Sequence, residues 1–472
     1  MARIEKSILI IGAGDAGQLL SRDIAKNYRS YQVIGFLDDN IKEAKLPILG
    51  KISDCQKVVN KYAVDEIVIA VPSADGKLIR TILLANLTNR LPIRIVPRSQ
   101  RVISKSLVRY EEVKDIQPED FLGRPFVRNN VDRLKRYYRD KTVFVTGGAG
   151  SIGSEIVRQL VDLEVKKVVV YDNSEYLIFM LEQQLKERGQ RDRCDLIIGS
   201  ILNDDKLDHL FKTIKPDIVF HAAAYKHVHL MQDNIDESVH NNVIGTKRAI
   251  DAAIKNNILL QTFISTDKVV NPTSVMGATK KLCEYYINSL DKAKVKFNVV
   301  RFGNVINSNG SVLPLFERQI ILHRYVTITH RKMERFFMSI REAAQLVIES
   351  TATGETDSIH VLNMGELINI YEVALCLIRS KNLLPTQDVE VRVMGLRKGE
   401  KLIEELYTKT EQANLSQTKD SRILALKNRD IPERDINEII ADLGKKIESD
   451  RHNLSLRAAL KEIFPTLKLG DE

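Results

Sequence analysis

The sequence predicts an α/β protein with two doubly wound parallel β-sheets, the second followed by a smaller C-terminal lobe. Two units of strand, glycine loop and helix support this prediction. The apolar run Ser7–Ile11 leads into the loop Gly12–Gly17, and the run Thr142–Val145 leads into Gly147–Gly153. After each unit, short apolar runs alternate with amphipathic stretches. This alternation is typical of parallel strands connected by helices.

The first Rossmann-like domain is expected over residues 1–125. Its strands are predicted at residues 7–11, 32–37, 66–71 and 93–96, and a helix follows the glycines to about Tyr28. Asp38 ends the second strand, where a carboxylate can bind ribose hydroxyls. We find no residues after this loop that could carry hydride chemistry. Two interpretations stay open: a nucleotide or other cofactor site, and a ligand-free structural or regulatory fold.

The rest of the chain is expected to form a linker, a second domain and a tail. Residues 126–140 are the linker and 141–426 the second domain, with a nucleotide-binding part at about 141–302 and a loop-rich substrate lobe at about 303–426. Its strands are predicted at residues 142–145, 167–171, 195–198, 218–220, 262–264 and 297–301. The tail, 427–472, has apolar residues at spacings of three and four and is predicted to be helical.

Composition limits the class of protein. The chain has 472 residues, 44% of them hydrophobic and 28% charged, which is typical of a globular protein. No apolar run approaches the ~18–20 residues of a membrane helix, and Met1–Lys6 lacks the apolar core of a signal peptide. Four scattered cysteines fit a reducing compartment. We therefore expect a cytoplasmic protein without a transmembrane segment.

The charge pattern gives no sign of a nucleic-acid partner. Lys and Arg exceed Asp and Glu by 71 − 62 = 9, and the excess is spread along the chain. The densest cluster, Arg133–Arg139, also has helical apolar spacing, which favours a solvated linker helix over a nucleic-acid patch. His227 and His229 have no third ligand near them in the sequence, so no metal site is predicted.

The second glycine loop predicts a dinucleotide site. Gly147, Gly150 and Gly153 follow a strand and open a helix, and Asp172 ends the next strand. Glycines let the backbone approach a pyrophosphate at the helix N-terminus, and the acid accepts hydrogen bonds from the ribose. Asp172 would repel a 2′-phosphate, so NAD is expected rather than NADP.

The run from Ser265 to Lys280 is the candidate active-site segment. It contains Thr266-Asp267-Lys268 and, further on, Met276 four residues before Lys280. It resembles the active-site segment of extended short-chain dehydrogenases/reductases, in which a Tyr stands four residues before the Lys. Met has no ionisable proton, so either the protein is not an enzyme or proton transfer has moved to other residues.

Longer runs in the second half resemble the UDP-N-acetylglucosamine 4,6-dehydratase family of polysaccharide biosynthesis. They span most of residues 141–407 and include Thr146–Glu155, His221–Val228, Asn241–Thr246, Ser265–Lys268, Arg301–Val305, Ser308–Pro314 and Gly395–Leu402. The first domain is similar to that of the longer family members, many of which carry transmembrane helices before it. Here Gly12 is close to the start, so a naturally soluble or a trimmed member is expected. Met276 is similar to what the longer subgroup carries.

The resemblance implies a redox-neutral elimination on UDP-N-acetylglucosamine. Hydride is removed from sugar carbon 4, water is eliminated across carbons 5 and 6, and hydride returns to carbon 6. The product is a UDP-linked 4-keto-6-deoxy sugar. One base must reach carbon 5 and one acid the carbon 6 hydroxyl. Lys268 is expected to be the base, with a lowered pKa, and Asp267 the acid, with a raised pKa.

The resemblance also implies a set of site residues. The catalytic residues are Thr266, which binds the carbon 4 oxygen, Asp267, Lys268, Met276, and Lys280, which binds the nicotinamide ribose. The cofactor residues are Gly147, Gly150, Ser151, Ile152, Gly153, Asp172, Ser200, Ile201, Ala222, Ala223, Ala224 and Lys280. The substrate residues are Lys226, Asn304, Ser308, Ser311, Arg335, Arg397 and Glu400. Ser200 departs from the usual Asp, and His229 from the usual Pro.

Two other functions are weighed against the dehydratase. A nucleotide-sugar 4-epimerase needs no acid/base pair at carbons 5 and 6, so Asp267-Lys268 speaks against it. A non-catalytic NAD-binding sensor or scaffold is compatible with the missing Tyr. A homo-oligomer is implied by the family. The sequence does not determine the configuration at carbon 5, and it leaves open the group that deprotonates the carbon 4 hydroxyl, for which Asp267 is the first candidate.

Overall fold

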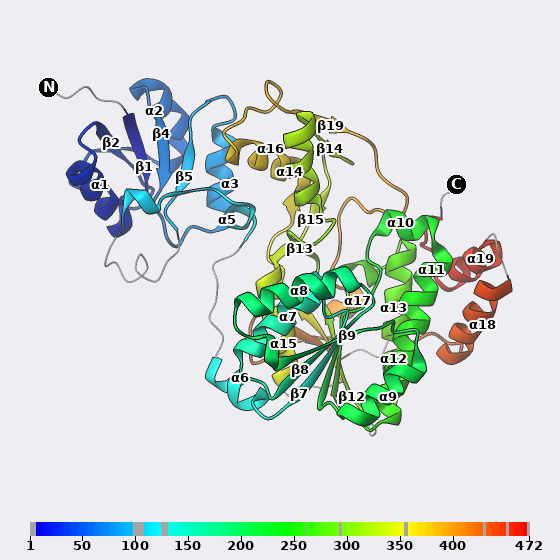
Figure 1. Ribbon diagram of the computed structural model, residues 1–472. Helices are drawn as coiled ribbons and strands as arrows, with labels where there is room; N and C mark the ends of the chain where they lie inside the picture. Colours follow the sequence, from blue (N-terminus) through cyan, green and yellow to red (C-terminus); the bar gives the residue numbers. More distant parts are fainter. Residues whose placement is uncertain are drawn as a thin grey trace. The chain divides into compact units, whose positions relative to one another are not determined.

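The computed structural model describes residues 6–97, 108–123, 131–258, 260–291, 295–353, 357–427, 431–449 and 453–469. These residues form two compact units (Figure 1). The first unit comprises residues 1–126, 312–333 and 368–395, and the second comprises 127–311, 334–367 and 396–472. Each unit contains a mostly parallel sheet with helices packed on it, so the expected α/β class with two doubly wound sheets is confirmed.

The first unit is centred on a six-stranded sheet of order β3-β2-β1-β4-β5-β6. All neighbours are parallel except β5 and β6, which are antiparallel. The strands are β1 Lys6–Ile11, β2 Tyr31–Leu37, β3 Ile48–Gly50, β4 Glu66–Ile69, β5 Ile93–Ile95 and β6 Lys114–Asp115. The four strands predicted from apolar runs are confirmed to within about two residues at their ends.

The glycine loop of the first unit has the geometry that its sequence predicts. Gly12 has φ +104°, and a Cβ at Gly17 would lie 1.9 Å from the carbonyl oxygen of Gly12. Asp38 accepts backbone N–H bonds from Ala13, Asn40 and Ile41 at 2.8–2.9 Å. Burial alone would raise the pKa of Asp38, but these three donors outweigh burial and lower it. Asp38 therefore holds the loop in place as an ionised acceptor.

The helices of the first unit come from its N-terminal segment and from its two later segments, residues 312–333 and 368–395. The N-terminal part supplies α1 Asp15–Asn27, α2 Cys55–Tyr62, α3 Gly76–Ala85 and α5 Pro118–Leu122. Residues 312–333 and 368–395 add α14 Val312–His323, α16 Ile370–Ser380 and the parallel pair β14 Tyr325–Ile328 and β19 Glu390–Val393. Helix α16 packs against α3.

A buried arginine fastens α16 to the N-terminal part of the first unit. Arg379 is fully buried, and its guanidinium donates to the carbonyl oxygens of Asn86 and Leu91, both at 2.8 Å. The sequence-based division placed residues 312–333 and 368–395 in the substrate lobe of the second domain, whereas they pack within the first unit. The boundary expected near residue 125 lies outside the described residues.

The second unit is centred on a nine-stranded sheet of order β20-β21-β17-β12-β11-β10-β7-β8-β9. The seven strands from β17 to β9 are parallel, while β21 is antiparallel to both of its neighbours. The strands are β7 Thr142–Thr146, β8 Lys167–Asp172, β9 Cys194–Ile198, β10 Ile218–His221, β11 Leu260–Ile264, β12 Lys296–Arg301, β17 Ser358–Leu362, β20 Leu415–Gln417 and β21 Ile423–Leu426. The sheet thus extends beyond residue 302, into the region expected to form only the substrate lobe.

Helices cover both faces of this sheet (Figure 1). One apolar layer contains α6 Val131–Tyr138, α7 Ser151–Asp162, α8 Glu175–Glu187 and α15 Ile340–Ala352. The other contains α9 Asp204–Ile214, α12 Thr246–Lys255 and α13 Val275–Ser289. The expected linker ends in α6, which belongs to this unit because the Tyr138 hydroxyl donates to the carbonyl of Ile348 at 2.9 Å.

The C-terminal tail is helical, as its spacing predicts. It contains α18 Ile436–Ser449 and α19 Leu454–Ile463. Their buried apolar residues, among them Ile439, Leu443 and Leu460, share one core with Tyr286 and Ile287 of α13. Between α11 Ile235–Val239 and α12, a π-helix over His240–Gly245 packs against the same group of helices. The tail therefore supports the helix that carries Met276 and Lys280.

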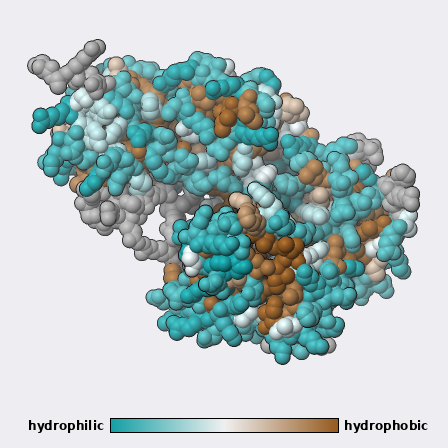
Figure 2. All heavy atoms as spheres, in the orientation of Figure 1, coloured by the Kyte–Doolittle hydropathy of each residue, from teal (hydrophilic) through white to brown (hydrophobic). Residues whose placement is uncertain are grey.

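The surface is mainly hydrophilic on the face drawn in Figure 2, with hydrophobic residues gathered in separate patches. Within the described residues, no helix is both long enough and apolar enough to cross a membrane. All four cysteines are buried free thiols.

Candidate active site

A cavity lies at the carboxyl ends of β7, β8 and β10, where the strand order of the second sheet reverses. It is lined by Gly147, Gly150, Tyr171, Asp172, Asn173, Ser174, Leu177, Gly199, Ile201, Ala222, Ala223, Ala224, Tyr225 and Asn241. β7 lies between β8 and β10, so the helices after β7 and β10 leave on opposite faces. Such a switch point is where doubly wound sheets bind nucleotides.

The glycines of this loop are required by close backbone packing. Gly147 has φ +62°, and a Cβ there would lie 2.6 Å from the backbone nitrogen of Ala223. A Cβ at Gly153 would lie 2.1 Å from the carbonyl oxygen of Gly147. Gly150 is the N-cap of α7 and caps it with no side chain. The first N–H groups of α7 are thus left for an anion such as a pyrophosphate.

Asp172 stands at the end of β8, beside the glycine loop. Its Oδ2 accepts the Ala149 N–H at 3.1 Å and its Oδ1 accepts the Ser174 N–H at 3.0 Å. The side chain is mostly buried, yet it lines the cavity. Each carboxylate oxygen has a second acceptor site, so Asp172 can also accept hydrogen bonds from a ribose.

The other cofactor residues expected from the sequence divide into two groups. Ile201 and the three alanines 222–224 line the cavity, whereas Ser151, Ile152, Gly153 and Ser200 are not among its lining residues. Ser200 accepts the Tyr171 hydroxyl on its carbonyl at 2.8 Å, and its own hydroxyl accepts the Leu202 N–H at 3.2 Å. Ser200 therefore shapes the loop. Sequence reasoning missed Asn241, which lies in the π-helix, a feature frequent at functional sites.

Thr266, Asp267 and Lys268 follow the end of β11 in a tight turn. Asp267 is fully buried, and its Oδ1 accepts the Thr266 hydroxyl and the Lys268 ammonium, both at 2.9 Å. Its Oδ2 has no hydrogen-bond partner among the described residues. A Cβ at Gly303 would lie 3.0 Å from that oxygen, so a larger residue there would crowd Asp267. In this arrangement one oxygen of Asp267 accepts two hydrogen bonds and the other has no partner among the described residues.

Lys268 joins this turn to a neighbouring strand. Its Nζ also donates to Asn304 Oδ1 at 3.1 Å. Burial alone would lower the pKa of Lys268, but the carboxylates of Asp267 and Glu404 outweigh burial and raise it. This raised pKa differs from the lowered pKa that was expected for Lys268 as a base. The ligand-free protein therefore holds Lys268 as an ammonium paired with Asp267.

Helix α13 carries the other two expected catalytic residues, both nearly inaccessible. Met276 is 4% exposed and Lys280 is 5% exposed. Burial lowers the pKa of Lys280 to about 8. The Lys280 ammonium lies 3.8 Å from the centre of the Phe263 ring, a cation–π distance. Neither residue is among those that line the cavity at the glycine loop or the polar cavity beside Lys268 that is described below.

A buried ion network connects α13 with β11 and β12. Arg301 and Glu284 are both fully buried and form two parallel hydrogen bonds, Nε to Oε1 at 2.8 Å and Nη2 to Oε2 at 2.7 Å. Nη1 of Arg301 donates to Glu411 at 2.9 Å, and Ser265 donates to Glu284 at 2.7 Å. Because Ser265 directly precedes Thr266, this network positions the turn Thr266–Lys268, the candidate catalytic turn, against the helix of Lys280.

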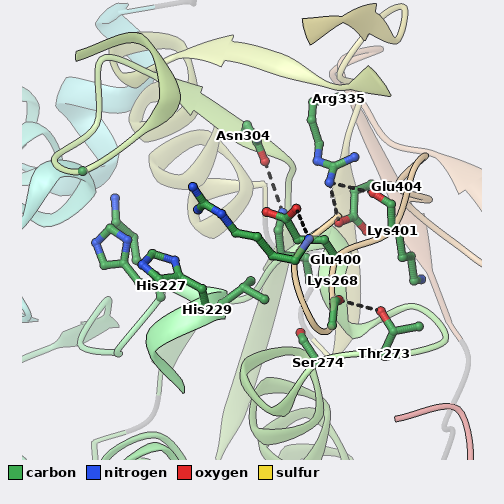
Figure 3. A pocket seen from close by; sticks show the side chains of 15 residues that line it. His227, His229, Lys268, Thr273, Ser274, Asn304, Arg335, Glu400, Lys401 and Glu404 are labelled. Atoms are coloured by element: carbon green, nitrogen blue, oxygen red, sulfur yellow. Dashed lines mark hydrogen bonds and ion pairs between the residues drawn. The ribbon is translucent and has the colours of Figure 1, made fainter. Parts of the chain in front are cut away.

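A second, more polar cavity lies beside Lys268 and is shown in Figure 3. In this view Lys268 lies between the pair His227 and His229 and the pair Arg335 and Glu404. The lining residues are Lys226, His227, Val228, His229, Lys268, Thr273, Ser274, Asn304, Gly310, Arg335, Arg397, Gly399, Glu400, Lys401 and Glu404. Cationic side chains predominate, which suits an anionic ligand.

Five of the seven expected substrate residues line this second cavity: Lys226, Asn304, Arg335, Arg397 and Glu400. Ser308 and Ser311 are not among its lining residues; the Ser308 hydroxyl donates to the Val305 carbonyl at 3.1 Å. The loop that contains them contacts the glycine loop, because Asn309 N–H donates to Ser151 Oγ at 3.0 Å.

The two arginines among the expected substrate residues, Arg335 and Arg397, differ in their surroundings. Arg335 is 6% exposed, and its guanidinium donates to the carbonyl oxygens of Glu334, Lys401 and Leu402 at 2.8–3.0 Å. Arg335 therefore holds the segment around Lys401 in place. Arg397 is exposed and better able to meet a phosphate.

Glu404 is one of the lining residues that were not expected from the sequence. It is 5% exposed, and its Oε1 lies 3.8 Å from the Arg335 guanidinium. The signal in the sequence was the run Gly395–Leu402, which ends two residues before it. Among the described residues, no three His, Cys, Asp or Glu side chains come together as a metal site.

Comparisons with known proteins agree with this geometry. Residues 143–426 match the family described as polysaccharide biosynthesis protein, and residues 2–97 match a CoA-binding domain. The capsular polysaccharide biosynthesis protein CapD of Staphylococcus aureus is 36% identical over 417 residues, covering 86% of this chain and 69% of that protein. A UDP-glucose 4-epimerase of Rickettsia rickettsii is 32% identical over 304 residues, covering 62% of this chain and 85% of that protein.

A solved structure shows the same fold. The X-ray structure of Pen from Bacillus thuringiensis has a TM-score of 0.57 and 30% identity, covering 66% of this chain and 98% of that chain. Fold and glycine loop define the class as an extended short-chain dehydrogenase/reductase. Within that class, the chain belongs to the polysaccharide biosynthesis protein family.

Proposed function

We propose that the protein is a nucleotide-sugar-modifying enzyme, and specifically an NAD-dependent UDP-N-acetylglucosamine 4,6-dehydratase. One observation supports the dehydratase in particular. Lys268 lines the polar cavity, and its ammonium is hydrogen-bonded to Asp267 and Asn304. An elimination across carbons 5 and 6 needs proton-transfer groups at this place. A 4-epimerase, the function named for the Rickettsia relative, does not need them.

The cofactor part of the proposal rests on the first cavity. Gly147, Gly150 and the open N-terminus of α7 can hold a pyrophosphate, and Asp172 can hold the adenosine ribose. When bound, NAD⁺ supplies hydride acceptance at carbon 4 and hydride return to carbon 6. Lys280, a buried cation on α13, is proposed to bind the nicotinamide ribose, and Met276 to pack beside it.

The proton transfers are assigned to the catalytic turn. Thr266, which is partly exposed, binds the carbon 4 oxygen and passes the proton of the carbon 4 hydroxyl to the buried Asp267, to which its own hydroxyl donates at 2.9 Å. Protonation of Asp267 removes a negative charge that raises the pKa of Lys268. Lys268 is therefore a poor base before carbon 4 is oxidised and a better one afterwards, when the ketone has acidified the carbon 5 proton. Arg397 and Lys226 are proposed to bind the diphosphate.

The test is incubation of the protein with UDP-N-acetylglucosamine and NAD⁺, followed by mass spectrometry. We expect a product lighter by one water. A product of unchanged mass with inverted configuration at carbon 4 would support an epimerase instead, and binding without any product would support a sensor or scaffold.

Variants make the same test specific for the site. Lys268→Ala is expected to lose dehydration by at least about 100-fold, while the protein stays folded. Lys57→Ala is the matched control, since its side chain is 86% exposed in the first unit. Wild-type turnover by Lys268→Ala would remove Lys268 from the mechanism.

A further inference from the structure

Glu404 is a buried carboxyl group that faces the polar cavity and has no assigned role. Only 5% of the residue is exposed, yet it lines the same cavity as Lys268 and Arg335. Its Oε2 has no hydrogen-bond partner among the described residues, and its Oε1 has only the long 3.8 Å contact with Arg335. Such a buried oxygen without a partner is unusual in a folded protein, so the carboxyl group of this cavity-lining residue has no close hydrogen bond among the described residues.

Asp267 does not lie at the cavity wall as Glu404 does, although the family resemblance implied that Asp267 is the acid for the leaving hydroxyl. It is fully buried and is not among the residues that line the polar cavity. Its Oδ1 is engaged by Thr266 and Lys268, and Gly303 lies against its Oδ2. An acid must reach the oxygen that it protonates, and of these two carboxyl groups Glu404 is the one at the cavity wall.

The charges around Glu404 suit a group that holds a proton. Burial raises the pKa of Glu404, and the nearby Asp267 carboxylate raises it further. The cations Lys268, Arg335 and Lys401 oppose this effect without cancelling it. Burial and like charge are the usual means by which enzymes keep a carboxylic acid protonated.

We propose that Glu404 is the general acid that protonates the carbon 6 hydroxyl as water leaves. The inference rests on the proposed dehydratase and identifies a further catalytic residue for it. Lys268 and Glu404 line one cavity (Figure 3), so base and acid can serve the two neighbouring carbons of one sugar.

The step balances with these two residues. In the 4-keto sugar, Lys268 takes the carbon 5 proton, and the C5–H electron pair becomes the C5=C6 double bond. The C6–O bond breaks, and its oxygen takes the proton of Glu404 and leaves as water. Lys268 ends as an ammonium and Glu404 as a carboxylate. The ammonium then returns a proton to carbon 5 when carbon 6 has been reduced.

Lys268 carries a proton in the ligand-free protein and must lose it before it can act as a base. Glu404 can accept this proton. When Asp267 has taken the proton of the carbon 4 hydroxyl, its charge no longer raises the pKa of Lys268, and in the desolvated cavity a proton shift from Lys268 to Glu404 gives two neutral groups. After the cycle, Asp267 holds the proton of the carbon 4 hydroxyl and Glu404 has lost one. Lys268, hydrogen-bonded to Asp267, can pass this proton on to Glu404.

The experiment compares two substrates in the full-length protein with NAD⁺. Glu404→Gln keeps the size of the side chain but removes its acidic proton. With UDP-N-acetylglucosamine we expect dehydration to fall by at least about 100-fold, as on loss of a general acid. With the 6-deoxy-6-fluoro analogue, fluoride leaves without needing a proton, so fluoride release should fall by less than tenfold. The Glu404 charge raises the pKa of Lys268, so its removal leaves Lys268 available as a base.

Controls separate a chemical role from a structural one. Glu405→Gln changes the exposed neighbouring residue and should match wild type on both substrates. Glu404→Asp should retain part of the dehydration that Glu404→Gln loses. Equal losses on the hydroxyl and fluoro substrates would overturn the assignment, and so would an unchanged rate in Glu404→Gln. If wild type converts neither substrate, the dehydratase proposal fails, and this assignment fails with it.

Discussion

Arg301→Met is the most direct test of how the catalytic turn is positioned. The Arg301 guanidinium is fully buried and makes hydrogen bonds of 2.8, 2.7 and 2.9 Å to Glu284 and Glu411. Its removal leaves Glu284 buried with Ser265 at 2.7 Å and Lys281 at 3.8 Å as its remaining partners. Breaking a buried pair on one side costs about 3–5 kcal/mol.

Amide hydrogen exchange of peptides from β12 and α13 is the assay, because it reports local opening free energies without assuming one global transition. We expect these peptides to lose about 3–5 kcal/mol of protection. The matched control is Arg188→Met, whose two bonds to Asp162 are similarly short, 2.8 and 2.9 Å, but lie at the surface with side chains 41% and 51% exposed. An exposed pair contributes about 0–1 kcal/mol.

A double variant tests the cause of the loss. Arg301→Met with Glu284→Gln removes the unpaired charge and should recover about half of the lost protection, since a neutral amide is less costly to bury than a carboxylate. Burial alone would raise the pKa of Glu284, but Arg301 outweighs burial and lowers it below the ordinary value of 4.5. The contribution of the Arg301–Glu284 pair to stability is therefore complete above pH 4.5, and it is lost as the pH falls through the lowered pKa of Glu284. A loss in Arg301→Met no larger than that in Arg188→Met would refute the reasoning.

Three further predictions concern the cofactor site and its helix. Gly147→Ala should abolish NAD⁺ binding in calorimetry, because its Cβ would lie 2.6 Å from the Ala223 nitrogen; Gly189→Ala, with a similar φ of +64° and nothing within 4 Å, should leave binding intact. Asp172→Ser should raise NADP⁺ affinity relative to NAD⁺ by at least about tenfold in the same assay, since a 2′-phosphate no longer meets a carboxylate. Lys280→Met should be more stable than wild type at neutral pH, because burial lowers the folded-state pKa of Lys280 from its ordinary value of 10.5 to about 8 and so penalises the buried ammonium. The difference in unfolding free energy between Lys280→Met and wild type should shrink by about 1 kcal/mol as pH rises from about 7 to about 9. A difference that does not depend on pH would contradict this prediction.

The sequence predicted the sheets well because their strands are short apolar runs next to glycines. The runs at residues 7–11 and 142–145 became β1 and β7, buried on both faces as parallel strands require. The Gly147 loop was predictable for the same reason: its spacing is local, and its steric requirement acts within a few residues. Asp172 followed from its place at the end of a strand.

Long-range packing could not be predicted in this way. Residues 312–333 and 368–395 lie within the sequence range of the second domain but pack with the first unit. Arg379, in the second of these segments, donates to carbonyl groups almost 300 residues earlier. No local pattern marks an arginine that will donate to distant carbonyl groups. Glu404 was missed for a similar reason, since a carboxyl group in a charged run usually faces solvent. Its burial depends on Arg335, which lies far away in the sequence.

Met276 stands at the place of the usual tyrosine, and the proposed dehydratase can work without that tyrosine. A tyrosine at this place would take the proton of the carbon 4 hydroxyl and stand next to a lysine that lowers its pKa. Here Lys280 is buried beside Phe263 with a lowered pKa of its own, and Met276 fills the space without needing a hydrogen-bond partner. The groups that can hold a proton lie instead around Lys268, at Asp267 and Glu404. In the proposed dehydratase each of the three has one task, because each meets a different surrounding: Asp267 is paired with a cation, Lys268 is held between carboxylates, and Glu404 is buried with one free oxygen.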